Sequence, residues 1–135
     1  MGGSDRAAQN RAAPAISTRA GGAASVNARA ALLRDLEALI GREKVISDEL
    51  DLLCYSYDSS FLAKLNRFVP DVVVTPLSTA DVVKVVRYAY DHEIPIIPRG
   101  AASGETCGAI ALNGGIVLDL SLWDEIIEVD APNMQ

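Results

Sequence analysis

Apolar residues recur at helical spacing early in the chain. Leucines and one isoleucine fall mostly three or four positions apart from Leu32 to Ile40, which is the pattern of a buried face on an α-helix. Gly41 follows at the position where a glycine commonly ends a helix. The next stretch holds apolar residues without a clean period, and we expect only residues 48–54 to form a short helix there. This part of the pattern predicts a helical lead-in.

Past Pro70 the pattern predicts a strand followed by a helix. Residues 72–75 are a β-branched run between two prolines, and such a run indicates a buried strand. Ser78 is followed three residues later by Asp81, which is the spacing of a capping box with an acid in the first turn. The valines that follow share one helical face, and this spacing outweighs the strand preference of valine. We expect the helix to end near His92.

Three more strands are predicted after this helix. Residues 94–97, 115–120 and 125–129 are short apolar runs of the length that strands have. The order strand, helix, strand over residues 72–97 describes a compact βαβ unit, in which the two strands run parallel with a right-handed crossover. The predicted fold class is therefore α+β, with helices followed by an α/β subdomain that contains the βαβ unit and further strands.

The composition is that of one soluble globular domain. The chain has 135 residues, of which 50% are hydrophobic and 22% charged, with a mean hydropathy of +0.19. These values exclude wholesale disorder, a collagen helix and a disulfide scaffold. A net charge of −6 argues against a nucleic-acid partner, because such partners require basic surface. The sequence has no run of about 18 apolar residues and therefore predicts no membrane span.

Charge is distributed unevenly along the chain. Residues 1–31 carry four arginines and one acid, whereas residues 32–135 carry eight bases and seventeen acids. The first stretch is rich in alanine, glycine and serine and cannot bury enough apolar surface to offset the entropy of ordering. We therefore expect a disordered tail over residues 1–28, a helical lead-in over residues 29–69 and a sheet-containing domain over residues 70–135. A transit peptide is the open alternative for the tail, because such leaders are arginine-rich and acid-poor.

Two cysteines, Cys54 and Cys107, stand far apart without a metal-ligand spacing. Chains of this kind are typical of reducing compartments, so we expect a cytoplasmic protein in which both thiols are free and buried. No cluster of residues predicts a metal site.

The residues between the second and third strands are the candidate site. The stretch from 98 to 109 is full of small side chains, with glycines at 100, 104 and 108, and glycine permits left-handed backbone angles. Successive N–H groups in such a loop can form an anion-binding nest. Small side chains also let a phosphate approach the backbone closely. The pattern therefore predicts a phosphate-binding loop.

Three polar side chains strengthen this interpretation and one weakens it. Arg99 supplies a fixed cation, and Ser103 and Thr106 supply hydroxyl donors, in a chain that is acidic elsewhere. Glu105 opposes phosphate binding unless its side chain points away. The glycine spacing matches neither the dinucleotide fingerprint of Rossmann folds nor a Walker A loop. A tight connection without a ligand therefore explains the spacing equally well.

Three segments of the chain, taken in order, resemble a known family. They are PDVVVTPLSTADV at residues 70–82, IPIIPRGAASG at residues 94–104 and GGIVLDLS at residues 114–121. Together they resemble the start of a PCMH-type FAD-binding domain of the vanillyl-alcohol-oxidase superfamily. The most similar branch is that of the glycolate oxidase D subunit and the FAD-linked D-lactate dehydrogenases. The upstream helix and the Tyr57–Asp58 region also resemble that branch, so the likeness covers roughly residues 32–133.

The resemblance implies a flavin site on the same loop. In the family this loop wraps the pyrophosphate of FAD, and the proline that closes the first strand lies near the adenine. Ala102 stands where the family often has glycine, which is a mild departure unless a positive φ is required there. Some relatives attach FAD covalently through a histidine or cysteine, but this loop has no histidine and we expect Cys107 to pack as a small residue, so non-covalent FAD is implied. The implied cofactor-binding residues are Pro76, Pro98, Arg99, Gly100, Ala101, Ala102, Ser103, Gly104, Gly108 and Ala109.

The resemblance also implies an activity. The family oxidises a 2-hydroxy acid such as glycolate or D-lactate with FAD, and partner electron-transfer subunits take part in glycolate-oxidase-like systems. In the family the chain continues past the equivalent of residues 128–130 into a second FAD-binding subdomain and a substrate-binding cap. We therefore expect a fragment that holds about half of a flavin site, has no catalytic residue and is inactive by itself. A non-catalytic nucleotide- or anion-binding module and a non-functional truncated product stay open as alternatives.

Overall fold

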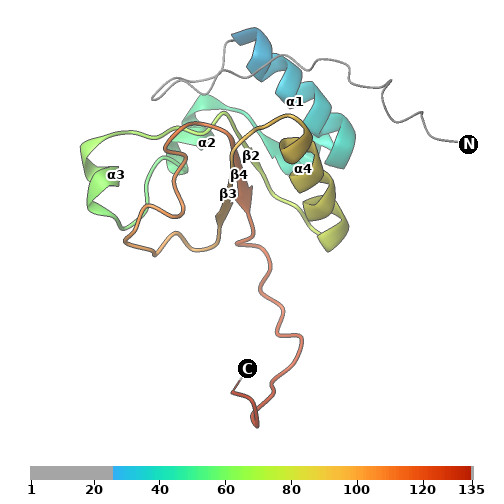
Figure 1. Ribbon diagram of the computed structural model, residues 1–135, viewed down its shortest axis with the longest axis vertical. Coiled ribbons are helices and arrows are strands. Elements are labelled where there is room, and N and C mark those ends of the chain that lie inside the picture. The colour runs from blue at the N-terminus through green and yellow to red at the C-terminus, as the bar shows by residue number, and fades with distance from the viewer. Residues whose placement is uncertain (1–25, 135) are drawn as a thin grey trace, which may run out of the picture.

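The structure has three layers, with a small sheet between two layers of helices. Helices α1 (Val26–Ile40) and α4 (Thr79–Asp91) cover one face of the sheet, and the short helices α2 (Glu49–Cys54) and α3 (Phe61–Leu65) lie on the opposite side (Figure 1). The computed structural model describes residues 26–134. Among these residues, no helix is both long enough and apolar enough to cross a membrane.

Most of the tail predicted over residues 1–28 lies outside the described residues. Its last three positions begin α1, so this helix starts before the apolar pattern from Leu32 onward. Arg29 fastens the start of α1 to the sheet, because its Nε donates to the carbonyl of Asp71 at 2.9 Å and its Nη2 donates to the carbonyl of Ser47 at 3.0 Å.

Four strands form the sheet, in the order β1 (Val45–Ile46), β2 (Val72–Val74), β4 (Ile116–Asp119) and β3 (Ile96–Arg99). β1 pairs antiparallel with β2, whereas β4 pairs parallel with both β2 and β3. The two strands of the predicted βαβ unit are thus parallel, as expected, but β4 lies between them. The predicted α+β class with a parallel core is confirmed.

Both faces of the sheet are buried. Val72 and Val74 join a core cluster that includes residues of α1 and α4, and Val73 joins a second cluster that includes Leu52 of α2. All three valines are fully buried. The alternation follows from the two-residue repeat of a strand, and burial on both faces explains why this short run contains no polar residue.

The predicted ends of the first two helices are confirmed. α1 ends at Gly41, which has a φ of 99° and donates its N–H to the carbonyl of Glu37 at 3.0 Å. A positive φ of this kind favours glycine. The helix predicted over 48–54 is α2, and Asp48 caps it by accepting the N–H of Leu50 at 2.9 Å.

Helix α4 begins at the capping pair that the sequence predicts. The Ser78 hydroxyl accepts the N–H of Asp81 at 3.2 Å, and the Asp81 carboxylate accepts a hydrogen bond from Lys44 Nζ at 2.9 Å. Lys44 closes a 3-10 turn, η1 (Arg42–Lys44), that follows α1. This ion pair therefore joins the start of α4 to the segment between α1 and β1.

Strand β3 begins two residues later than the predicted run 94–97. Ile94 donates its N–H to the carbonyl of Ala89 at 2.9 Å, in the turn that follows α4. Pro95 has no N–H to donate and supplies only its carbonyl, which accepts the N–H of Ile116 at 2.9 Å. Pro98 is tolerated within β3 because this strand lies at the edge of the sheet.

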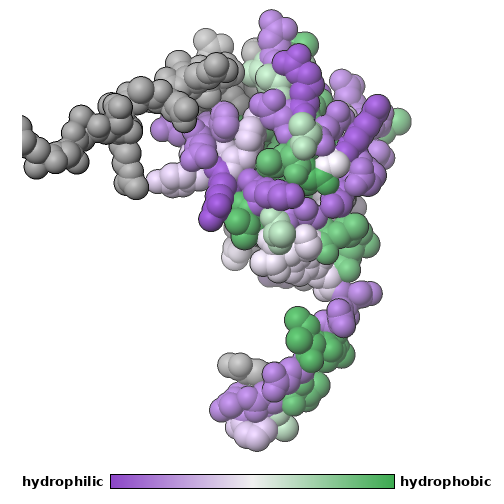
Figure 2. Space-filling model, turned by 90° about the vertical axis from the view of Figure 1, so that its right-hand side faces the viewer, coloured by the Kyte–Doolittle hydropathy of each residue, from purple (hydrophilic) through white to green (hydrophobic). Residues whose placement is uncertain are grey.

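The strand predicted over residues 125–129 is wrong. The segment is irregular and exposed, and within the described residues no strand pairs with it. Ile126, Ile127 and Val129 are 79%, 93% and 76% exposed, and Figure 2 shows this apolar surface on a tail that runs away from the body of the domain. A strand pattern without a partner strand cannot complete its hydrogen bonds, so the pattern alone does not produce a strand.

We predict that Leu36→Ala lowers the free energy of unfolding by about 2–5 kcal/mol, which is the usual cost of a large cavity in a core. Leu36 is fully buried in the cluster shared by α1, α4 and the sheet. Urea unfolding followed by circular dichroism measures the change. Leu50→Ala is the control, because Leu50 is 74% exposed on α2; an equal loss in both variants would contradict the packing described here.

The Lys44–Asp81 ion pair predicts a dependence of stability on pH. The hydrogen bond from Lys44 holds the pKa of Asp81 below its ordinary value, against the opposing effect of burial. Because the folded-state pKa is depressed, the pair stabilises the fold above the unfolded-state pKa, about 4, and this stability is lost as the pH falls through the folded-state pKa. Urea midpoints of Asp81→Asn should therefore be lower at pH 7 and fall less steeply below pH ~4.

Asp91→Asn, at the exposed last residue of α4, is the matched control for this change of charge. If the urea midpoint of Asp81→Asn falls at low pH as steeply as that of wild type, the result would count against the ion pair.

Candidate functional site

Three parallel strands end at one edge of the sheet, and the candidate residues follow those ends. Because β4 runs parallel to both β2 and β3, Pro76, Arg99 and Asp119 stand at or just past the carboxyl ends of their strands. Ligands of open parallel sheets bind outside this edge. Figure 1 shows that the loop after β3 and the tail after β4 both leave the sheet there.

The structure brings most of the predicted site residues together on one segment. Nine of the ten lie between Pro98 and Ala109, at the end of β3 and on the loop that follows. The tenth, Pro76, follows β2, which is separated from β3 by β4.

The loop from Gly100 to Gly108 has backbone N–H groups without a partner among residues 26–134. No backbone N–H in this range donates a hydrogen bond to another described residue. The range contains neither helix nor strand, and only Ala102 and Cys107 are partly buried in it. Exposed N–H groups without internal partners can bind an anion.

The left-handed backbone angles of the loop are not at its glycines. Ala102 has a φ of 54° and Cys107 a φ of 64°, whereas Gly100, Gly104 and Gly108 have no positive φ. These three glycines permit left-handed angles but do not adopt them. A Cβ atom at any of the three would meet nothing within 4 Å, so these glycines leave open space beside the backbone. The positive φ at Ala102 means that this departure from the family pattern carries a conformational cost.

Arg99 ties the start of the loop to its end. Its side chain is buried, and Nη1 donates to the carbonyl of Tyr57 at 2.9 Å and to the carbonyl of Ala109 at 3.0 Å. The guanidinium carbon also lies 5.3 Å from the centre of the Tyr55 ring, within the range of a cation–π contact. Arg99, which the sequence predicts as a cation for phosphate, thus has its Nη1 engaged by two carbonyl oxygens of the protein.

Tyr55 and Asp119 form a second polar contact at this edge. The Tyr55 hydroxyl donates to Asp119 Oδ2 at 2.8 Å, and Asp119 Oδ1 accepts the N–H of Ser121 at 2.8 Å. Burial, with the hydrogen bond and charge of Asp119, raises the pKa of Tyr55 to about 12. Tyr55 is therefore a hydrogen-bond donor at neutral pH, and it holds the end of β4 in place.

Asp58 is a buried carboxylate beside the loop. It is not among the site residues that the sequence predicts. Its Oδ1 accepts the N–H of Ser60 at 2.9 Å, whereas its Oδ2 is buried and has no hydrogen-bond partner among the described residues. Burial opposes ionisation, but the hydroxyl and N–H of Ser60, the backbone of Ala109 and the charge of Arg99 together hold the pKa of Asp58 below its ordinary value. The only sequence signal for Asp58 is the family resemblance at residues 57–58.

A hollow lies beside Pro76. It has a volume of about 370 Å³ and is lined by residues 77–79 at the start of α4 and by residues 122–125 and 127 of the tail. The indole N–H of Trp123 donates to the carbonyl of Pro76 at 2.7 Å, so the tail forms one wall of the hollow. Pro76 itself is fully buried and can shape the hollow only through its backbone.

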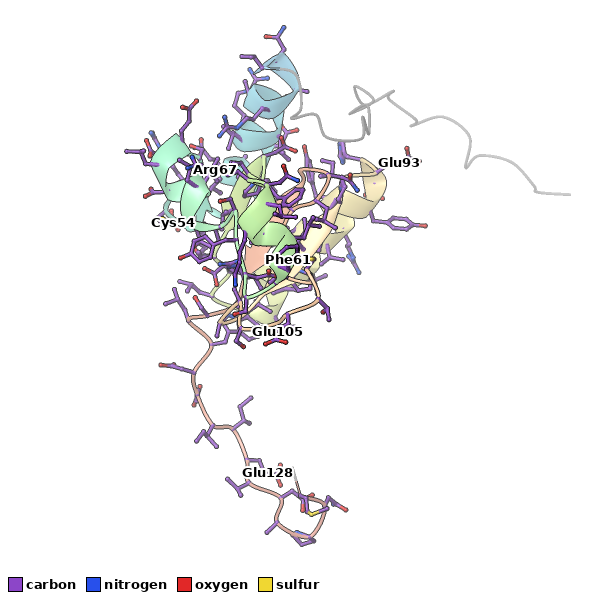
Figure 3. The ribbon with its side chains drawn as sticks, turned by 90° about the vertical axis from the view of Figure 1, so that its left-hand side faces the viewer. Cys54, Phe61, Arg67, Glu93, Glu105 and Glu128 are labelled. Carbon is purple, nitrogen blue, oxygen red and sulfur yellow. The ribbon has the colours of Figure 1, made fainter. Side chains whose placement is uncertain are left out.

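Three other side chains were singled out in the sequence, namely Glu105, Cys54 and Cys107. Glu105 is exposed at the edge of the domain (Figure 3). Cys54 is exposed and Cys107 is partly buried, so the expectation of two buried thiols is wrong. Within the described residues no group of histidine, cysteine, aspartate and glutamate could hold a metal ion.

Comparison with known proteins points to flavin enzymes. Residues 70–135 match the model of a family described as FAD binding domain. The glycolate oxidase subunit GlcD of Bacillus subtilis is 29% identical over 94 residues, which cover 70% of this chain and 19% of the relative. The D-2-hydroxyglutarate dehydrogenase of Stutzerimonas stutzeri is 31% identical over 98 residues, covering 73% of this chain and 20% of the relative. The chain thus spans about a fifth of these curated relatives.

Solved structures share the fold at lower identity. A substrate-bound p-cresol methylhydroxylase matches 78% of this chain and 21% of its own with a TM-score of 0.65 and 24% identity. An alkyldihydroxyacetonephosphate synthase matches 90% of this chain and 26% of its own with a TM-score of 0.66 and 18% identity. Both enzymes therefore share the fold of most of this chain. Residues 70–135 of this chain match the FAD binding domain family.

Proposed function

We propose that residues 98–109 bind the pyrophosphate of non-covalently held FAD, in a flavin-dependent oxidoreductase that acts on a 2-hydroxy acid. The observation that carries this proposal is the run of unpartnered N–H groups from Gly100 to Gly108 at the carboxyl end of β3. A pyrophosphate carries two negative charges and accepts several hydrogen bonds, so it matches a loop that offers donors and keeps its side chains small.

The surroundings of the loop support an anion rather than a neutral ligand. The buried guanidinium of Arg99 contacts the end of the loop at Ala109, and Ser103 and Thr106 are exposed on the loop. The three glycines leave open space beside the backbone, so the phosphate oxygens can come close to the N–H groups. Glu105 is exposed at the edge of the domain (Figure 3).

The adenosine end of the cofactor fits the hollow beside Pro76. Asp124 and Glu125 line it, and their carboxylates repel phosphate but accept hydrogen bonds from ribose hydroxyls or from the adenine amine. Trp123 adds an aromatic surface there. This arrangement supports a polarity in which the phosphates lie over the loop and the nucleoside lies toward α4.

The substrate and reaction are proposed by analogy with the named relatives, which are a glycolate oxidase subunit, a D-2-hydroxyglutarate dehydrogenase and a D-lactate dehydrogenase. When bound, FAD would accept a hydride from the α-carbon of the 2-hydroxy acid. The role proposed for this chain is to hold and orient the cofactor. We further propose that residues 70–135 form the cofactor-binding unit behind a lead-in over residues 29–69, that these 135 residues alone do not catalyse the reaction, that partner subunits carry the electrons onward, and that the protein is cytoplasmic.

A non-catalytic nucleotide-binding module is the second candidate. It is favoured by the absence, among the described residues at this edge, of any carboxylate or histidine placed as an acid–base pair. Activity of the full-length protein separates the two candidates: the oxidoreductase would reduce bound FAD when a 2-hydroxy acid is added, whereas a nucleotide module would bind FAD without reducing it.

We predict that the purified chain changes the fluorescence of added FAD, that ADP competes with FAD for the site, and that adenosine competes only weakly. Fluorescence titration at fixed ionic strength gives the three dissociation constants. An absence of any FAD binding, or competition by adenosine as strong as that by ADP, would contradict a pyrophosphate loop.

A second prediction concerns Ala102, whose φ is 54°. Ala102→Val should weaken FAD binding by roughly tenfold, because a β-branched side chain strongly disfavours this left-handed angle. Ala102→Gly should bind FAD at least as tightly as wild type, because glycine adopts the angle without strain. Ala80→Val, on the exposed first turn of α4, controls for the added methyl groups. Equal affinity in the valine and glycine variants at position 102 would show that this angle is unimportant for binding.

A further inference from the structure

Arg99 joins the two ends of the loop to each other and to the turn at residues 57–60. Arg99, at the start of the loop, donates to the carbonyl of Tyr57 at 2.9 Å. Ala109, at its end, is held by the same Nη1 of Arg99 at 3.0 Å. The turn that includes Asp58 therefore contacts the arginine that joins the two ends of the loop.

The turn uses only one of the two carboxylate oxygens of Asp58. Its Oδ1 completes the turn by accepting the N–H of Ser60 at 2.9 Å. Its Oδ2 is buried without a partner among the described residues, although the backbone of Ala109 and the charge of Arg99 lie close enough to favour its ionised form. An unpaired oxygen of a buried carboxylate is costly, so a small movement of the loop end that donates the Ala109 N–H to Oδ2 would be favourable.

We propose that Asp58 is a positioning residue, which fixes the closing end of the loop at Ala109 so that the N–H groups before it face the pyrophosphate of a bound dinucleotide. This inference rests on the proposed function and goes beyond it, because it assigns a role to a side chain outside the loop. Asp58 does not contact the ligand; it acts through Ala109 and through the charge of Arg99. The titratable and charged groups near it are the Arg99 guanidinium, the neutral Tyr55 whose ring that guanidinium contacts, and Asp119, which accepts from Tyr55.

The decisive variant is Asp58→Asn. Asparagine keeps an oxygen that can accept the N–H of Ser60, so the turn is retained, but it removes the negative charge from the second position. Asp91→Asn is the matched control, since Asp91 is exposed at the far end of α4. We expect Asp58→Asn to weaken FAD and ADP binding about tenfold or more, the usual effect of losing a hydrogen bond to a charged group, and to leave the affinity for adenosine unchanged.

Failure of the inference and failure of the proposed function can be distinguished. If wild type binds FAD and ADP but Asp58→Asn binds both equally well, Asp58 has no positioning role while the site stands. If the variant loses adenosine affinity to the same extent as ADP affinity, the role of Asp58 is merely structural and the inference is overturned. If wild type binds neither FAD nor ADP, the proposed function fails and the inference fails with it.

A measurement on the wild-type chain covers the case in which the variant does not fold. The amide proton of Ala109 should shift in the ¹⁵N-resolved spectrum as Asp58 titrates, with a midpoint below about pH 4, the ordinary value for aspartate. Addition of ADP at pH 7 should move the same proton downfield as its hydrogen bond to Oδ2 forms. An Ala109 amide that responds to neither change overturns the inference.

Discussion

The pairing of β4 between β2 and β3 is the constraint on which the rest of the structure depends. β4 is separated from β3 in sequence by the whole loop, yet it pairs with β3 from Ile96 to Arg99 and with β2 over the length of that strand. Because all three strands are parallel, their carboxyl ends stand at one edge. The loop, the hollow beside Pro76 and the tail are placed together only by this pairing.

Within that frame, the loop is held at its ends and open in its middle. Arg99 closes the opening by donating to Ala109, and the sheet register fixes where each end emerges. The residues between have unpartnered N–H groups and open space beside the glycines. Rigid ends with a free centre suit a binding loop, because the ligand then supplies the missing hydrogen bonds without first displacing internal ones.

Features fixed by neighbouring residues could be predicted from the sequence. The cap of α4 depends on Ser78 and Asp81, three residues apart, and the buried strand depends on consecutive valines, so both patterns are complete within a few residues. The order of the strands could not be predicted in this way, because insertion of β4 is a choice among long-range pairings. The segment 125–129 has a strand pattern but no partner strand among the described residues, and a pattern cannot supply one.

The site shows the same division. The position of the loop followed from its small residues and from the family resemblance, whereas the left-handed angles at Ala102 and Cys107 did not, because glycine permits such angles but does not require them. The contacts of Arg99 join residues 42 and 10 positions apart in sequence and are set by packing alone. Asp58 was missed for this reason, since its environment exists only after the turn at 57–60 meets the loop.

The most direct test of a pyrophosphate-binding loop is a titration of the ¹⁵N-labelled chain with FAD, observed at the amides of Gly100, Gly104 and Gly108. These three resonances should shift together, in proportion to saturation, and more strongly than amides at the opposite edge of the sheet such as that of Glu93. Glycine amides that stay in place while FAD binds elsewhere would contradict the account.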